Sequence, residues 1–142
     1  MYRQYGVCCA ILLGVGGIAG CSSGSGEVPR AIVHGKVTYQ GKPVETGIIT
    51  FIPGPNVSGS SVQLVIHDGQ YDSHSDPVDS RGVVVGENQI QILATRKTGK
   101  QVQNPNNELE DEVIQYIPEK YNTATELQRD VQSGNNEFDF EL

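Results

Sequence analysis

The chain has 142 residues, with 10 Lys and Arg against 17 Asp and Glu, so its formal net charge is −7. This length predicts one domain, or one domain with appendages. A nucleic-acid-binding protein should carry a basic surface, so the acidic balance disfavours nucleic-acid partners. The lack of Trp and the three scattered Cys argue against a zinc-ribbon or disulfide scaffold.

Residues 1–20 have the composition of an export signal. A single positive charge, Arg3, precedes an uncharged apolar run over residues 7–19. At about 1.5 Å per residue this run covers roughly 20 Å, too little for a bilayer core of about 30 Å. A basic start, a short apolar run and small residues before a break together predict a signal peptide that is removed.

The segment Ile18-Ala19-Gly20-Cys21 follows the apolar run. It resembles the lipobox of bacterial lipoproteins, in which cleavage precedes a Cys that receives a diacylglyceryl group. The resemblance implies lipidation of Cys21 and attachment to a membrane through it, with an ordinary signal peptide as the alternative. Ser22 after the Cys favours the outer membrane of the cell envelope, and residues 21–30 read as a lipidated Cys followed by a Ser/Gly tether.

Apolar and polar residues alternate through most of residues 31–142, which is typical of half-buried strands. Turn residues separate these runs. Asp68-Gly69 is the strongest hairpin signal, between runs at 61–67 and 70–73. The pattern predicts an all-β domain of short strands and short connections.

One segment departs from this alternation. Residues 107–110 have the spacing of a capping box, and Leu109, Val113 and Tyr116 share one face of a helix that Pro118 would end. The sequence therefore predicts a short helix near residues 108–116, with a polar crossover loop as the alternative.

The order of several segments is informative: Val33–Val44, Gly47–Pro53, Asp68–Tyr71, Gly86–Ile92, Ile117–Asn122 and Gly134–Leu142. Together they resemble carboxypeptidase regulatory-like domains, in a branch of small bacterial lipoproteins. That family has a transthyretin-like (prealbumin-like) fold, so the resemblance implies a seven-stranded antiparallel Greek-key β-sandwich over residues 31–142. Residues 76–85 and 97–111 depart from the family pattern, so no loop function carries over.

The residues that carry the resemblance have structural explanations. A glycine within a strand weakens it unless another backbone approaches closely or a bulge forms, so Gly35 is expected at such a place. The aromatic residues should supply much of the core in a domain without Trp. These are Tyr71, Tyr121, Phe138 and Phe140.

Three histidines, His34, His67 and His74, are the first candidates for metal ligands. Ligation would require them to converge, and the strand pattern places His34 and His67 outward and His74 in a loop. We expect scattered surface histidines, no bound metal and no other cofactor.

Acidic residues gather in three segments: Asp72, Asp76 and Asp79; Glu108, Glu110, Asp111 and Glu112; and Glu137, Asp139 and Glu141. The first two could collect Ca²⁺, but they lack EF-hand spacing and are expected to be solvated loops. The third could bind a cation or basic partner. We favour the interpretation that it protects a sheet edge from pairing.

No pattern of catalytic residues emerges. The chain has no Gly-x-Ser-x-Gly motif, and Phe138–Leu142 replaces the C-terminal Tyr-Arg-Gly-Ser motif of hydroxyisourate hydrolases, which share the transthyretin fold. We expect a non-catalytic, lipid-anchored envelope protein with a binding or structural role. The alternatives are an accessory domain for an envelope hydrolase and a cryptic hydrolase.

The partner could be an envelope protein or a polysaccharide, and the sequence assigns no binding residues. Because exposed loops commonly carry binding sites, Ser73–Gly82 and Lys97–Asp111 are the first segments to test.

Overall fold

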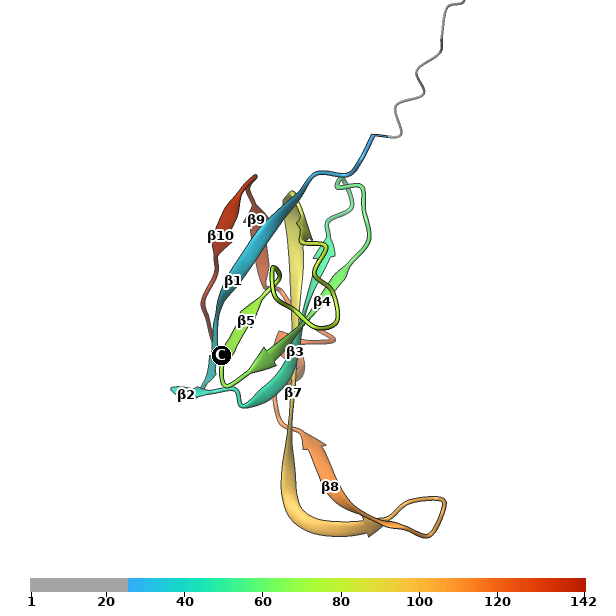
Figure 1. Cartoon of the computed structure of the whole chain (residues 1–142). Coiled ribbons are helices and arrows are strands. Elements are labelled where there is room, and N and C mark those ends of the chain that lie inside the picture. The colour runs from blue at the N-terminus through green and yellow to red at the C-terminus, as the bar shows by residue number, and fades with distance from the viewer. Residues whose placement is uncertain (1–25) are drawn as a thin grey trace, which may run out of the picture.

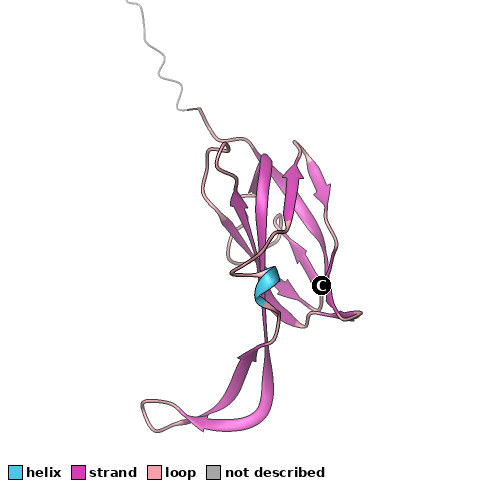
Figure 2. Ribbon diagram, turned by 180° about the vertical axis from the view of Figure 1, so that it is seen from behind, coloured by secondary structure: helices cyan, strands magenta, loops and turns pink. Residues whose placement is uncertain are grey.

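A computed structural model describes residues 26–142 of the protein (Figure 1). The predicted signal peptide (1–20), Cys21 and the first part of the tether lie outside the described residues. Residues 26–142 form an all-β sandwich whose single helical element is one short 3-10 turn, η1 (Figure 2). No helix in this range has the length and apolar character needed to cross a membrane. The prediction of an all-β fold is confirmed.

The strands follow each other along the chain with short connections. They are β1 (Arg30–Tyr39), β2 (Lys42–Pro43), β3 (Thr46–Pro53), β4 (Val62–His67), β5 (Gln70–Asp72), β6 (Val83–Val84), β7 (Gly86–Gln103), β8 (Leu109–Gln115), β9 (Gln128–Val131), β10 (Asn135–Glu137) and β11 (Phe140–Glu141), with η1 (Glu119–Tyr121) between β8 and β9. They exceed the predicted seven because two-residue elements such as β2 and β6 add to the longer strands.

The strands are joined in the order β10-β1-β5-β4-β3-β7-β8, with β9 beside β7. β4 and β5 share one register pair, His67 with Gln70, so the sheet folds over at this place and its halves face each other. The sheet is not wholly antiparallel as predicted. β1 pairs in parallel with β10 and β11 because the chain enters β10 at the same end of the sandwich at which β1 begins.

The core lies between the two halves of the sheet. Side chains at alternate positions of the long strands are fully buried, as the alternating sequence requires. The largest of them are Phe51, Ile49, Leu64, Ile66, Ile90 and Ile92. Tyr71 and Phe140 are buried as predicted, whereas Tyr121 and Phe138 are partly buried and pack against the core.

Tight turns hold the short hairpins. Asp68 and Gly69 have φ angles of 48° and 76°, as a two-residue hairpin turn requires, and they connect β4 with β5 as predicted. Gln40 and Gly41 have φ angles of 50° and 76° and connect β1 with β2 in the same way.

The predicted helix near 108–116 is wrong, because these residues form strand β8 instead. β8 pairs with the second half of β7, and the two strands project from the sandwich as an arm, defined here as residues 95–115 (Figures 1 and 2). Lys97–Asp111 is therefore mostly paired strand, with a short loop at 104–108. Backbone pairing with β7, rather than burial of a helical face, determines the conformation of this segment.

Candidate functional site

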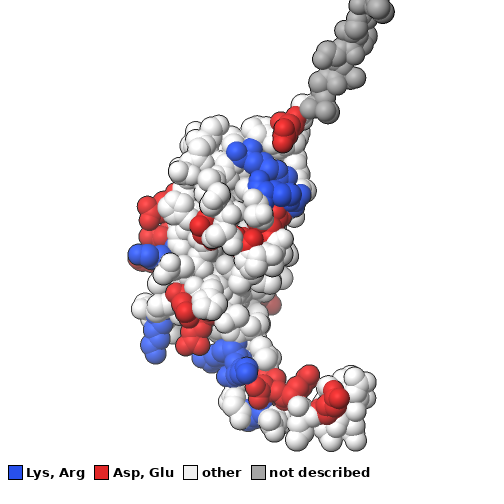
Figure 3. All heavy atoms as spheres, viewed as in Figure 1, with Lys and Arg blue, Asp and Glu red and all other residues white. Residues whose placement is uncertain are grey.

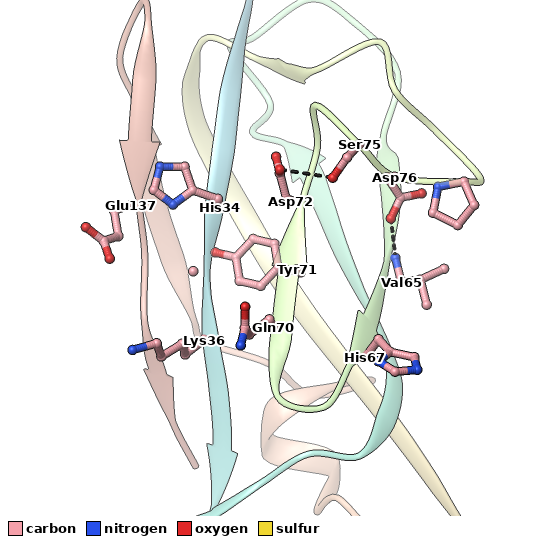
Figure 4. Close-up of a pocket in the computed structure, with 12 residues that line it drawn as sticks. His34, Lys36, Val65, His67, Gln70, Tyr71, Asp72, Ser75, Asp76 and Glu137 are labelled. Atoms are coloured by element: carbon pink, nitrogen blue, oxygen red, sulfur yellow. Dashed lines mark hydrogen bonds between the residues drawn. The ribbon is translucent and has the colours of Figure 1, made fainter.

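The first candidate site is a cleft of about 580 Å³ on the outer surface of β1, β5 and β4 (Figure 4). Gly35 and Tyr71 are among the residues that line it, and its polar lining includes His34, Lys36 and Asp72. The loop that follows β5 forms one wall through Ser75 and Asp76. The cleft thus gathers several of the residues that the sequence marked as candidates.

His34 is flanked by two carboxylates. It is the register partner of Asp72 on one side and of Glu137 on the other, so the three side chains leave the same face of neighbouring strands. His67 lines the cleft from β4, two strands from β1, which is about 10 Å at ordinary strand spacing. His74 lies outside the cleft. Residues 26–142 hold no cluster of three or more His, Cys, Asp or Glu suited to a metal ion.

The acidic residues beside the cleft act as hydrogen-bond acceptors for backbone N–H groups of their own loop and of β4. The Asp76 carboxylate is 8% exposed and accepts the backbone N–H groups of Val65 at 2.6 Å, Val78 at 2.7 Å and Asp79 at 2.9 Å. This contradicts the expectation of a fully solvated acidic loop. Because β5 is short, β4 has a free edge there, and Asp76 satisfies the Val65 N–H that would otherwise lack a strand partner.

The other two acids of this loop are more exposed. Asp72 accepts the backbone N–H of His74 at 2.8 Å and the Ser75 hydroxyl at 3.0 Å. Asp79 pairs with Arg81 at 2.6 Å, and hydrogen bonding to that guanidinium lowers the pKa of the Asp79 carboxyl. Each carboxylate therefore shapes the loop.

The floor of the cleft depends on close backbone packing at Gly35. A Cβ atom there would lie 2.0 Å from the carbonyl oxygen of Phe138, so the expected close approach is confirmed. The Asp139 carboxylate accepts the Lys36 N–H at 2.8 Å, which bridges the break between β10 and β11. All three residues of the predicted acidic stripe, Glu137, Asp139 and Glu141, are exposed, and Asp139 also completes the strand pairing.

The second candidate site is the arm. Its side chains are almost all exposed, among them the apolar Leu109 (65%) and Val113 (53%). Cross-strand polar contacts support it, with Lys97 Nζ 2.7 Å from Asp111 Oδ2 and the Thr98 hydroxyl donating to Glu112 at 2.6 Å. An isolated two-stranded ribbon is marginally stable in water. The arm thus offers apolar side chains and free backbone edges to a partner.

A hollow of about 600 Å³ lies where the arm joins the sandwich. We call it the basin. Tyr39, at the end of β1, and Tyr116, just after β8, meet edge to face there with ring centroids 5.7 Å apart. The Arg96 guanidinium lies 5.2 Å from the centre of the Tyr116 ring. Partial burial, and secondarily the charge of Glu45, raises the pKa of the Tyr116 hydroxyl.

Sequence reasoning missed the basin. Tyr39 was a residue of the first predicted strand, and Tyr116 belonged to the face of the wrongly predicted helix. The signal that could have found it is that each tyrosine lies beside a glutamine, Gln40 after Tyr39 and Gln115 before Tyr116, rather than within an apolar run.

The comparisons with known proteins assign this chain to no family. No family model and no curated protein matches the chain. Among solved structures, the chain is similar to a DUF3823 family protein from Parabacteroides merdae ATCC 43184, with 15% identity and a TM-score of 0.36 over 81% of this chain. The chain spans less than half of that protein, 46% of its length. So weak a match assigns no function, and the resemblance to carboxypeptidase regulatory-like domains stays a prediction.

Proposed function

We propose that this protein is a non-catalytic, lipid-anchored protein of the bacterial cell envelope that binds a partner through the end of the sandwich that carries the arm. The observation that carries the proposal is the position of the arm. It projects from the end of the domain opposite to the first described residues, which lead back toward Cys21 (Figure 1).

This arrangement suits a protein anchored at its N-terminal side. The predicted tether of residues 21–30 is shortened by the fold, because the Pro29 carbonyl accepts the Val85 N–H and β1 begins at Arg30. With Cys21 acylated and the residues before Pro29 as the tether, the arm and basin would face away from the lipid surface. Ser22 supports the outer membrane as the destination. A domain held in this way presents its far end to whatever lies beyond the membrane.

Two features favour binding over catalysis. The carboxylates of Asp72 and Asp76, which line the cleft, accept hydrogen bonds that hold the loop after β5, so these two candidate acid–base groups already have partners. The arm, by contrast, exposes Leu109 and Val113 beyond the body of the domain, where they stabilise no core. Apolar groups on an otherwise solvated projection commonly mark an interaction surface.

The anchor is tested with Cys21→Ser in the producing bacterium. We expect loss of acyl labelling and release of the protein from the membrane fraction. A variant with Ser22→Ala serves as the matched control and should keep both. Unchanged labelling and fractionation of Cys21→Ser would contradict the anchor.

The arm is tested by crosslinking in cells. Leu109→Ser and Val113→Ser should each reduce the yield of crosslinked partner several-fold, whereas Val78→Ser should leave it unchanged. Val78 is the matched control because it is 68% exposed and lies in the loop at 73–82, away from the arm. Equal yields from all three variants would contradict a binding role for the arm.

A further inference from the structure

The basin combines the surface of aromatic rings with hydrogen-bond donors and acceptors. Tyr39 and Tyr116 supply aromatic carbon, and both side chains are only partly buried, so the rings stay accessible from the hollow. The Gln40 amide donates to the Tyr39 hydroxyl at 3.3 Å and brings a further donor and acceptor to the rim. Such a mixture of apolar surface and a few oriented polar groups is characteristic of small-molecule sites.

The charges around the basin balance. Lys42 and Arg96 are positive, and Glu45 and Asp68 are negative. Within residues 26–142, none of Lys42, Glu45 and Arg96 takes part in an ion pair. Figure 3 shows basic and acidic side chains mixed at this end of the body, where the arm begins. The rim therefore offers ammonium, guanidinium and carboxylate groups that have not neutralised one another.

The charges of the rim give a charged ligand no net advantage. An anion would be attracted by Lys42 and Arg96 but repelled by Glu45 and Asp68, and the reverse holds for a cation. All four side chains are exposed, so an ion pair formed with a ligand would contribute little in water. Affinity must therefore come from contact with the tyrosine rings and from hydrogen bonds between neutral groups of the ligand and the charged side chains of the rim.

From these observations we infer that the basin binds a neutral carbohydrate. Sugar hydroxyls donate and accept, so they can satisfy carboxylates and cations at the same time. The C–H face of a sugar ring packs on an aromatic ring, and about 600 Å³ lies within the range for small-ligand sites of roughly 300–1,000 Å³. The inference deepens the proposed function, on which it rests, since it names a polysaccharide rather than a protein as the ligand of the arm end.

The test uses the full-length lipidated protein in detergent micelles and an array of neutral hexasaccharides of glucose, mannose, xylose and galactose. We expect at least one of them to bind, and Tyr39→Ala to weaken binding at least tenfold. Tyr121→Ala is the matched control, because Tyr121 is partly buried outside the basin. Arg96→Gln keeps a hydrogen-bond donor without the charge and should weaken binding less than Tyr39→Ala.

Tyr116→Phe is a second variant that should fold even if an alanine variant does not, because it keeps the ring contacts with Tyr39 and Arg96. It should retain the fold and lose only a few-fold in affinity. The inference is overturned if no hexasaccharide binds, if Tyr39→Ala binds as well as the parent, or if polygalacturonate or glycylglycine binds more tightly than every neutral sugar. Crosslinking of a protein partner to the arm in that case would leave the proposed function standing without the carbohydrate.

Discussion

The Tyr71 hydroxyl donates a hydrogen bond of 2.7 Å to the carbonyl oxygen of Phe138. Gly35 lies beside both groups, since it is the register partner of Tyr71 and leaves room for the Phe138 carbonyl. The bond joins β5 to the segment between β10 and β11 across β1. It thus ties three parts of the sandwich together beneath the cleft.

Removing this hydroxyl should destabilise the domain. Tyr71→Phe keeps a ring that is 3% exposed but deletes the donor to Phe138. We expect the free energy of unfolding to fall by about 1–3 kcal/mol, measured by urea denaturation. Tyr121→Phe is the control and should change it by less than about 0.5 kcal/mol. Equal effects of the two variants would show that the bond contributes nothing specific.

Gly35 should tolerate no side chain. Gly35→Ala would place Cβ 2.0 Å from the carbonyl oxygen of Phe138, so the backbones of β1 and the C-terminal segment must separate. We expect a loss of about 3 kcal/mol or more in the free energy of unfolding. Gly26→Ala, where no atom lies within 4 Å of the new Cβ, should be neutral. Wild-type stability of Gly35→Ala would refute the close approach.

Stability should decline at alkaline pH. Burial, helped by the charge of Asp139, raises the pKa of the Tyr71 hydroxyl above its ordinary value near 10. Above pH 10 the unfolded chain loses this proton before the folded chain does, so unfolding becomes easier as pH rises, by up to about 1.4 kcal/mol per pH unit. Urea unfolding at several pH values from 8 to 12 measures the slope, which should be shallower in Tyr71→Phe. Parallel slopes would exclude this group.

Asp76 should be the acidic residue of its loop on which stability depends most. Asp76→Asn keeps Oδ1 for the N–H groups of Val78 and Asp79 but loses Oδ2, the acceptor for Val65. We expect a loss of about 2–3 kcal/mol by thermal unfolding. Asp72→Asn should cost less than about 1 kcal/mol because its two hydrogen bonds are exposed. The reverse order of the two variants would contradict this account.

The arm should be dispensable for folding. Arg96 and Ile114 are register partners, so an Asn-Gly turn can replace residues 97–113 between them. Because the removed side chains are exposed and outside the core, we expect the free energy of unfolding to change by less than about 1 kcal/mol. A large loss of stability would mean that the arm supports the sandwich, and its proposed role as a free binding element would fail.

The strands of the body could be predicted because their alternation reflects burial on one face. Val62, Leu64 and Ile66 in β4 alternate with more exposed residues for this reason, as do Ile90 and Ile92 in β7. Asp68-Gly69 fixed a hairpin through backbone conformation alone. In each case a local property of the residues was sufficient.

The arm could not be predicted in this way. Both faces of β8 are largely exposed, so its apolar residues are not selected at every second position. The helical spacing of Leu109, Val113 and Tyr116 is therefore a coincidence. The cleft and the basin depend on register between distant segments. His34 meets Glu137, and Tyr39 meets Tyr116, only after the sheet has formed.

The parallel pairing of β1 with β10 and β11 has a consequence for the rate of folding. Ile32 donates to the carbonyl of Gly134, and Leu142 donates to that of Thr38, so the first strand is completed by residues about a hundred positions later. Closure over such sequence separations makes a fold of high contact order, which forms slowly. One edge of β1 thus stays unpaired until residues 134–142 have been made. Such late completion would fit the proposed export, because a chain must cross a membrane before it folds.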